Sequence, residues 1–140
     1  MKKKIKVLQV IPRLGYGGAE TGCYDLAHFL PERNYKSFIA TSGGELLKFV
    51  NKKKVKKVYT NSKKLYKLEK IDISAICTPP AMHFQNILDA IKNNTHTIVE
   101  KPFLIKYKDF LIKDNIVYCE GEPSNKTDDD AFKIIIKKIN

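Results

Sequence analysis

The stretch "IDISAICTPPAMHFQNILDAIKNNTHTIVEKP" (71–102) holds two apolar runs with an amphipathic segment between them. Residues 71–77 and 95–99 have the length and composition of buried strands. Residues 81–92 carry four apolar side chains on one helical stripe: Phe84, Ile87, Leu88 and Ile91. Strand, helix and strand in this order predict a βαβ unit, in which the two strands run parallel.

The same alternation continues toward the N-terminus. Apolar runs predict strands at 5–11 and 37–41 and a weaker one at 55–59. Helices are expected at three places, 20–30, 45–50 and 62–69, the last with Ser62 as its cap. The predicted fold class is therefore α/β: a Rossmann-like three-layer fold with a mainly parallel sheet flanked by helices.

The length of 140 residues fits one domain, 1–140, with a self-standing core. Residues 104–140 follow no clean period, although 116–119 suggests a strand and 130–139 a closing helix. No apolar run approaches the roughly 20 residues that span a bilayer, which predicts a cytoplasmic protein.

The chain is basic, with a net charge of +11 that comes almost entirely from lysine. Specific readers of nucleic acid favour arginine, and only Arg13 and Arg33 are present, so we expect a solvated surface and no nucleic-acid partner. The three cysteines, Cys23, Cys77 and Cys119, have no paired spacing and predict free thiols, with neither a disulfide framework nor a metal site.

Polar and proline residues follow two of the predicted strands. Thr78-Pro79-Pro80 comes after 71–77, and Glu100-Lys101-Pro102 comes after 95–99. In parallel sheets, ligands bind beyond the carboxyl ends of the strands, so both turns should line one crevice with the glycine turn Gly15–Gly18.

Residues 59–103 resemble the nucleotide-binding half of the glucose–fructose oxidoreductase and inositol dehydrogenase family (Gfo/Idh/MocA). The resemblance rests on a T-P-P turn followed by a histidine, a helix, and a strand that ends in E-K-P. The matching residues are Thr78, Pro79, Pro80, His83, Glu100, Lys101 and Pro102. It implies an oxidoreductase that uses NAD or NADP and acts on sugars or polyols, with Lys101 and His83 as catalytic residues and the others beside the cofactor. An ammonium group at Lys101 could orient a substrate hydroxyl and stabilise the developing alkoxide.

Residues 6–44 resemble a different family, the opening of family-4 type glycosyltransferases. The matching motifs are G-G-A-E at 17–20 and T-S-G-G at 41–44. In either family the first glycine turn lies near ligand phosphates, which makes Gly15, Gly17 and Gly18 candidate phosphate-binding residues. On this resemblance, residues 1–50 form a glycosyltransferase-like half and 55–103 an oxidoreductase-like half of a chimeric or truncated chain.

The N-terminal part departs from a dinucleotide fingerprint at two positions. Glu20 stands where the third glycine of G-x-G-x-x-G belongs, and a carboxylate there would repel pyrophosphate. Thr41 and Ser42 stand where NAD-binding domains carry an acidic residue for the ribose. This absence favours NADP, with Lys48 as the partner of its additional phosphate.

The leading hypothesis is a truncated or divergent NAD(P)-binding domain of a Gfo/Idh/MocA-like oxidoreductase, weak or inactive alone. Its partners would be the nucleotide cofactor, a sugar or polyol substrate and possible further copies of the chain. The alternatives are the acceptor-side domain of a glycosyltransferase and a non-catalytic nucleotide-binding module.

Overall fold

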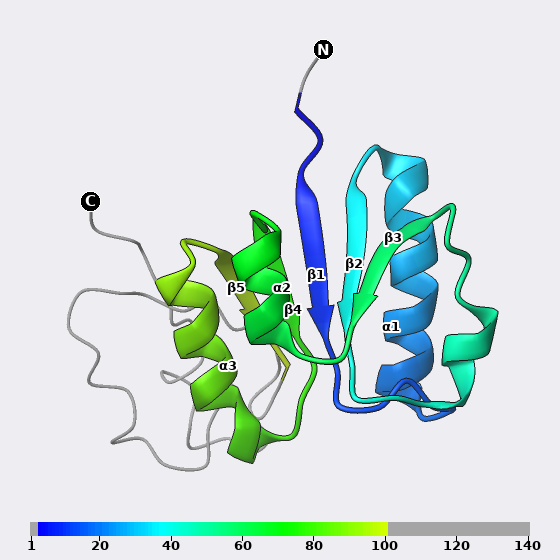
Figure 1. The fold of residues 1–140 in the computed structure, drawn as a ribbon. Helices are drawn as coiled ribbons and strands as arrows, with labels where there is room; N and C mark the ends of the chain where they lie inside the picture. The colour runs from blue at the N-terminus through cyan, green and yellow to red at the C-terminus, as the bar shows by residue number, and fades with distance from the viewer. Residues whose placement is uncertain (1–2, 101–140) are drawn as a thin grey trace, which may run out of the picture.

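The structure is a computed structural model that describes residues 3–100. Lys101, Pro102 and the segment 104–140, with its expected strand and closing helix, lie outside the described residues. One five-stranded sheet has the order β3-β2-β1-β4-β5, and all neighbouring strands are parallel (Figure 1). The strands are β1 (Lys6–Val10), β2 (Lys36–Ala40), β3 (Val55–Tyr59), β4 (Ile73–Ile76) and β5 (His96–Val99).

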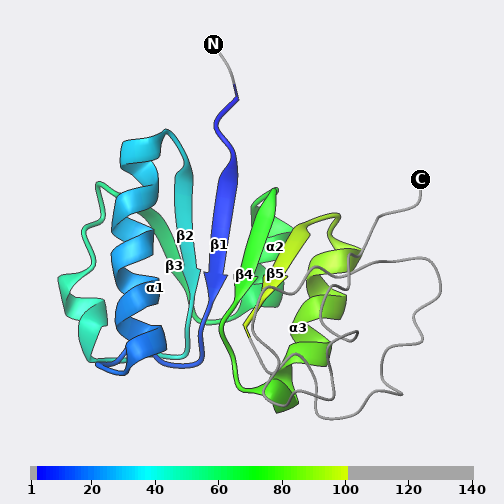
Figure 2. The same ribbon diagram turned by 180° about the vertical axis from the view of Figure 1, so that it is seen from behind.

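Helices cover both faces of the sheet, as the α/β prediction required. The α-helices are α1 (Gly18–Phe29), α2 (Ser62–Leu68) and α3 (Pro80–Lys92), and two 3₁₀ turns lie at η1 (Leu30–Arg33) and η2 (Glu45–Phe49). Figures 1 and 2 show α1 on one face and α2 with α3 on the other. The fold class predicted from the sequence is therefore confirmed.

The central strands β1 and β2 are mainly apolar on both sides, apart from the buried Gln9 and Ser37, because each face packs under a helix layer. On the α1 face, Cys23 and Ala27 of the helix join a cluster with Ile39 and Val55. On the opposite face, strand and helix residues form the second cluster: Leu8, Val10, Phe38, Ala40, Tyr59, Leu65, Tyr66, Ile71 and Ala90. The continuous apolar runs in the sequence therefore form the strands of the middle layer, which lies between two layers of helices.

The predicted boundaries differ from the structure in two informative places. The first helix begins at Gly18, two residues before the predicted start. The cap of α2 is Asn61, not Ser62, since the Asn61 side chain accepts hydrogen bonds from the backbone N–H groups of Lys63 and Lys64 at 2.8 and 3.3 Å. Ser62 is instead the first helical residue, which leaves its hydroxyl available to the surface above the sheet.

The loops that follow β1 and β2 are joined through their backbones. Leu14 N–H donates to Gly43 O at 2.7 Å, Leu46 N–H donates to Leu14 O at 2.9 Å, and Ser42 N–H donates to Pro12 O at 2.9 Å. Gly44 has a φ of +131°, and a Cβ atom there would lie 2.3 Å from the Leu14 carbonyl oxygen. Only glycine permits this approach, because any side chain would collide with backbone.

Within residues 3–100, no helix combines the length and apolar content needed to cross a bilayer.

Replacing Gly44 with alanine should lower the free energy of unfolding by about 2 kcal/mol or more, because the new methyl group meets the Leu14 backbone in an unfavourable φ region. Chemical denaturation of both chains measures this difference. Gly22→Ala is the matched control: no heavy atom lies within 4 Å of its added Cβ, and alanine favours a helix. Equal stabilities of Gly44→Ala and Gly22→Ala would contradict the steric argument.

The Cys23 thiol should be almost inert, because burial raises its pKa to about 12, with a further contribution from Cys77, and only the thiolate reacts. Iodoacetamide labelling at mildly alkaline pH, read by peptide mass spectrometry, should modify Cys23 more than about a hundredfold slower in the folded chain than in urea. Equal rates in the two conditions would contradict its burial.

Candidate functional site

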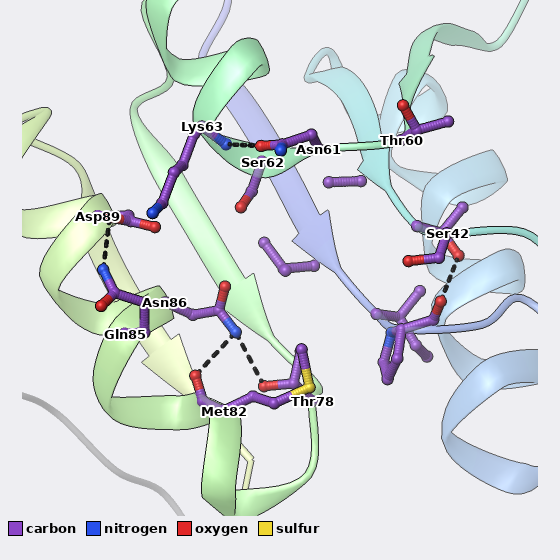
Figure 3. Close-up of a pocket in the computed structure, with 15 residues that line it drawn as sticks. Ser42, Thr60, Asn61, Ser62, Lys63, Thr78, Met82, Gln85, Asn86 and Asp89 are labelled. Carbon is purple, nitrogen blue, oxygen red and sulfur yellow. Dashed lines mark hydrogen bonds between the residues drawn. The ribbon is translucent and has the colours of Figure 1, made fainter.

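A pocket of about 270 Å³ lies beyond the carboxyl ends of β1, β2, β3 and β4. The starts of α2 and α3 close its sides (Figure 3). Its apolar lining comes from Val10, Ile11, Pro12, Ala40 and Met82. Its polar lining comes from Thr41, Ser42, Thr60, Asn61, Ser62, Lys63, Thr78, Gln85, Asn86 and Asp89. The pocket lies at the edge of the sheet where a ligand crevice was expected, but among the described residues of the three turns expected to line it, only Thr78 does so.

Thr41 and Ser42 bring the end of β2 to the pocket, and their role as cofactor-binding residues stays a prediction. The Thr41 hydroxyl donates to the Gly43 carbonyl oxygen at 3.0 Å and is buried at 4% exposure. Ser42 is exposed, and its backbone N–H is held by Pro12 O. Thr41 therefore shapes the loop, while the Ser42 side chain can meet a ligand.

The turn after β4 supplies Thr78 to the pocket floor. Asn86 donates its amide Nδ2 hydrogens to Thr78 Oγ1 at 3.2 Å and to Met82 O at 2.9 Å, as Figure 3 shows. Pro79 is the residue before α3, and Pro80 opens the helix, a position where proline loses no hydrogen bond. The T-P-P motif thus sets where α3 begins.

His83 lies in the first turn of α3 and is fully buried, at 0% exposure. Its ring Nε2 lies 2.5 Å from Thr78 O, and because a carbonyl oxygen only accepts, Nε2 is the donor. The side chain ties α3 to the strand-end turn and is not among the residues that line the pocket. Its catalytic role stays a prediction.

A polar stripe on α3 forms one wall of the pocket, and the sequence analysis missed it. Its polar members are Gln85, Asn86 and Asp89, and the apolar Met82 continues the same face toward the start of the helix. Asp89 is mostly buried and accepts a hydrogen bond from Gln85 Nε2 at 2.9 Å. Figure 3 shows the Lys63 side chain extending across the pocket toward Asp89. The stripe opposite the apolar one was the signal that could have found these residues.

The segment after β3 was also missed. Thr60, Asn61, Ser62 and Lys63 all line the pocket, although the sequence suggested only a weak strand followed by a capped helix. Four consecutive polar residues at the carboxyl end of a strand are the same kind of signal that selected Thr78.

The glycine turn lies beside the start of α1, and Gly15, Gly17 and Gly18 are not among the lining residues of the pocket. Gly17 precedes the helix, and its backbone N–H donates to the Glu20 carboxylate at 2.5 Å. The carboxylate of Glu20 also lies where a Cβ on Gly17 would be, at 2.6 Å. The donor that a phosphate would use is therefore taken by the chain itself.

A second carboxylate reaches the same turn. Arg13 forms an ion pair with Glu45, and this hydrogen bond holds the pKa of the Glu45 carboxyl below its usual range. A Cβ on Gly15 would lie 3.1 Å from oxygens of both Glu20 and Glu45. Arg13, which the sequence analysis did not assign to the site, thus compensates one of two negative charges around the turn.

The other residues predicted for the site either do not line the pocket or lie outside the described residues. Glu100 follows β5, and its backbone N–H donates to Ile76 O at 2.9 Å. Lys101 and Pro102 lie outside the described residues. Lys48 places its ammonium 4.9 Å from the Phe49 ring centre and is not a lining residue of the pocket.

The pocket offers hydroxyl and amide groups above an apolar floor, which suits a flat apolar ring with polar edges and a sugar. Its volume of about 270 Å³ lies just below the range of ligand pockets, roughly 300–1,000 Å³.

Comparison with solved structures finds dehydrogenases that share the fold. Scyllo-inositol dehydrogenase from Lactobacillus casei, solved with NAD(H) and scyllo-inositol, has a TM-score of 0.62 and 21% identity over 76% of this chain and 31% of its own. Myo-inositol 2-dehydrogenase from Lactobacillus plantarum gives 0.58 and 19%, over 76% and 31%. A probable dehydrogenase from Thermotoga maritima gives 0.57 and 20%, over 74% and 30%. The chain thus spans less than a third of the length of these structures.

No curated protein sequence matches the chain. The comparisons lend no support to the glycosyltransferase resemblance of residues 6–44.

The family model described as "Oxidoreductase family, NAD-binding Rossmann fold" matches residues 14–112, from the glycine turn to beyond the E-K-P motif. This range includes β2 to β5 and all three α-helices of the described structure. The chain therefore belongs to the Gfo/Idh/MocA oxidoreductase family and contains its NAD-binding Rossmann domain.

Proposed function

We propose that the pocket binds the adenosine half of a nicotinamide dinucleotide, and that the chain serves as the cofactor-binding part of an oxidoreductase acting on sugars or polyols. The observation that carries this proposal is the position of the pocket, at the carboxyl ends of adjacent parallel strands. The end of β2 receives the ribose next to adenine in this fold, and Ser42 lies there.

The residues fit the two halves of the cofactor unequally. The hydroxyls and amides around the pocket, with Ala40 and Met82 as apolar surface, match a nucleoside. On the pyrophosphate side the Gly17 N–H already donates to Glu20. The nucleoside half therefore fits as the residues stand, whereas the pyrophosphate half requires the Glu20 carboxylate to move.

The bound nicotinamide would accept or donate the hydride. The chain's own contribution to that step would come from Lys101, whose ammonium follows β5 in the sequence and could orient a substrate hydroxyl. We propose that turnover is weak, because the pyrophosphate half of the cofactor meets the Glu20 carboxylate. We also propose one domain, a cytoplasmic location and self-association as the setting of this function.

The choice between NAD and NADP follows from the charge at the end of β2. The family is NAD-binding, but Thr41 and Ser42 supply no carboxylate to reject a 2′-phosphate. Lys48 is not a lining residue of the pocket, and Lys63, which does line it, extends toward Asp89 on α3, so we assign neither lysine to that phosphate. Fluorescence titrations with NADH and NADPH decide between the two cofactors.

Filling the pocket should weaken cofactor binding. In Ser62→Trp, the indole would occupy much of the volume of about 270 Å³, so the Kd for NADH should rise at least about tenfold. Lys56→Trp introduces the same side chain at an exposed position of β3, away from the pocket, and should bind like the wild type. An unchanged Kd in folded Ser62→Trp would refute the assignment of the pocket.

Lys101→Ala should lower the rate of NADH formation with a polyol such as myo-inositol at least about a hundredfold, while the Kd for NADH changes less than about twofold. The two effects separate because the lysine would act on the substrate hydroxyl rather than on the cofactor. The measurement is a kinetic assay with a parallel fluorescence titration. A rate equal to that of the wild type would remove Lys101 from the proposed site.

A further inference from the structure

We infer that Glu20 is a specificity determinant: its carboxylate occupies the anion position at the start of α1 and lowers the affinity for pyrophosphate-containing ligands relative to uncharged nucleosides. This inference rests on the proposed nucleoside pocket, and it concerns a different set of residues beside that pocket.

The start of α1 has the features of an anion site. The helix is 12 residues long and follows a glycine turn, so backbone N–H groups and the positive end of the helix dipole point to one place. In a dinucleotide-binding fold, the pyrophosphate takes these donors. In this chain, the Glu20 carboxylate accepts a hydrogen bond from the Gly17 N–H at 2.5 Å. Its negative charge thereby offsets the positive end of the helix dipole.

The contacts around the glycines support the same conclusion. Glycine in a fingerprint turn leaves space for a phosphate to approach the backbone. Here the space beside Gly17 holds Glu20, whose oxygen would lie 2.6 Å from an added Cβ. The space beside Gly15 holds oxygens of Glu20 and Glu45, each 3.1 Å from an added Cβ. The glycines thus make room for carboxylates of the chain.

The carboxylate of Glu20 itself opposes a further anion. Arg13 and Lys48 both act on the Glu45 carboxyl, so the cations near the turn serve mainly Glu45. A pyrophosphate would bring its own negative charge beside the Glu20 carboxylate, and it would have to displace Glu20 to reach the Gly17 donor. An uncharged nucleoside in the pocket requires neither step.

A capping role alone predicts something different. In a capping box, glutamine at the third helical position serves as well as glutamate. Glu20→Gln therefore keeps the hydrogen bond to Gly17 and removes the charge. If Glu20 only caps the helix, this variant should bind every ligand as the wild type does.

The experiment is a calorimetric titration of the full chain with adenosine, AMP, ADP and NADH. In Glu20→Gln, the Kd for ADP and for NADH should fall at least about tenfold relative to the Kd for adenosine, which itself should not change. Glu20→Gly restores a G-x-G-x-x-G spacing with Gly15 and Gly17 and should shift the same ratio at least as far. The matched control is Glu32→Gln, which removes a carboxylate at the opposite end of α1, in η1, and should leave the ratio unchanged.

Each outcome decides one of the two claims. Equal ratios in the wild type, Glu20→Gln and Glu20→Gly, with adenosine bound in all three, overturn the role of Glu20 and leave the pocket assignment intact. Failure of adenosine to bind any of the folded chains overturns the pocket assignment, and the inference with it. A shift of the ratio in Glu32→Gln as large as in Glu20→Gln overturns the local argument, because it would be an effect of net charge.

Discussion

The contact between the backbones of Leu14 and Gly44 determines how the loops are arranged at the carboxyl ends of β1 and β2. A side chain at Gly44 would lie 2.3 Å from the Leu14 carbonyl oxygen, and hydrogen bonds on both sides of this contact join the loops after β1 and β2. The position of Ser42 at the pocket and the start of α1 both follow from that joint. Three backbone hydrogen bonds between the two loops would have to break before either loop could shift alone.

Two parts of the site with opposite character meet at this corner. The pocket over β1, β2 and β4 is lined by neutral hydroxyl and amide groups, with Lys63 and Asp89 at its side. The glycine turn next to it carries the carboxylates of Glu20 and Glu45. A Rossmann domain ordinarily offers a continuous path for a nucleoside and its phosphates. In the proposed arrangement, the pocket takes the nucleoside, and the Glu20 carboxylate stands where the phosphates would follow.

The periodicity of the sequence was enough to predict the parallel sheet and the helices on both faces, because buried strands and amphipathic helices have different repeat lengths. It also placed Thr41, Ser42 and Thr78 at the correct edge of the sheet. It could not find the wall formed by Gln85, Asn86 and Asp89, since a polar helical stripe is solvent-facing unless the tertiary arrangement turns it toward a pocket. The same limit applies to His83, whose burial against the Thr78 carbonyl depends on how α3 docks. The sequence alone showed that the Glu20 carboxylate would repel a pyrophosphate. The second carboxylate at the same turn, that of Glu45, comes from a segment about 25 residues away, and only the fold brings it there.

Because the Glu20 carboxylate accepts the hydrogen bond from the Gly17 N–H, it would compete with a bound phosphate as part of the same chain. A tethered carboxylate has a fixed effective concentration at the helix start, whatever the concentration of protein or ligand. The apparent affinity for a dinucleotide then equals the intrinsic affinity multiplied by the fraction of molecules in which this side chain has swung away.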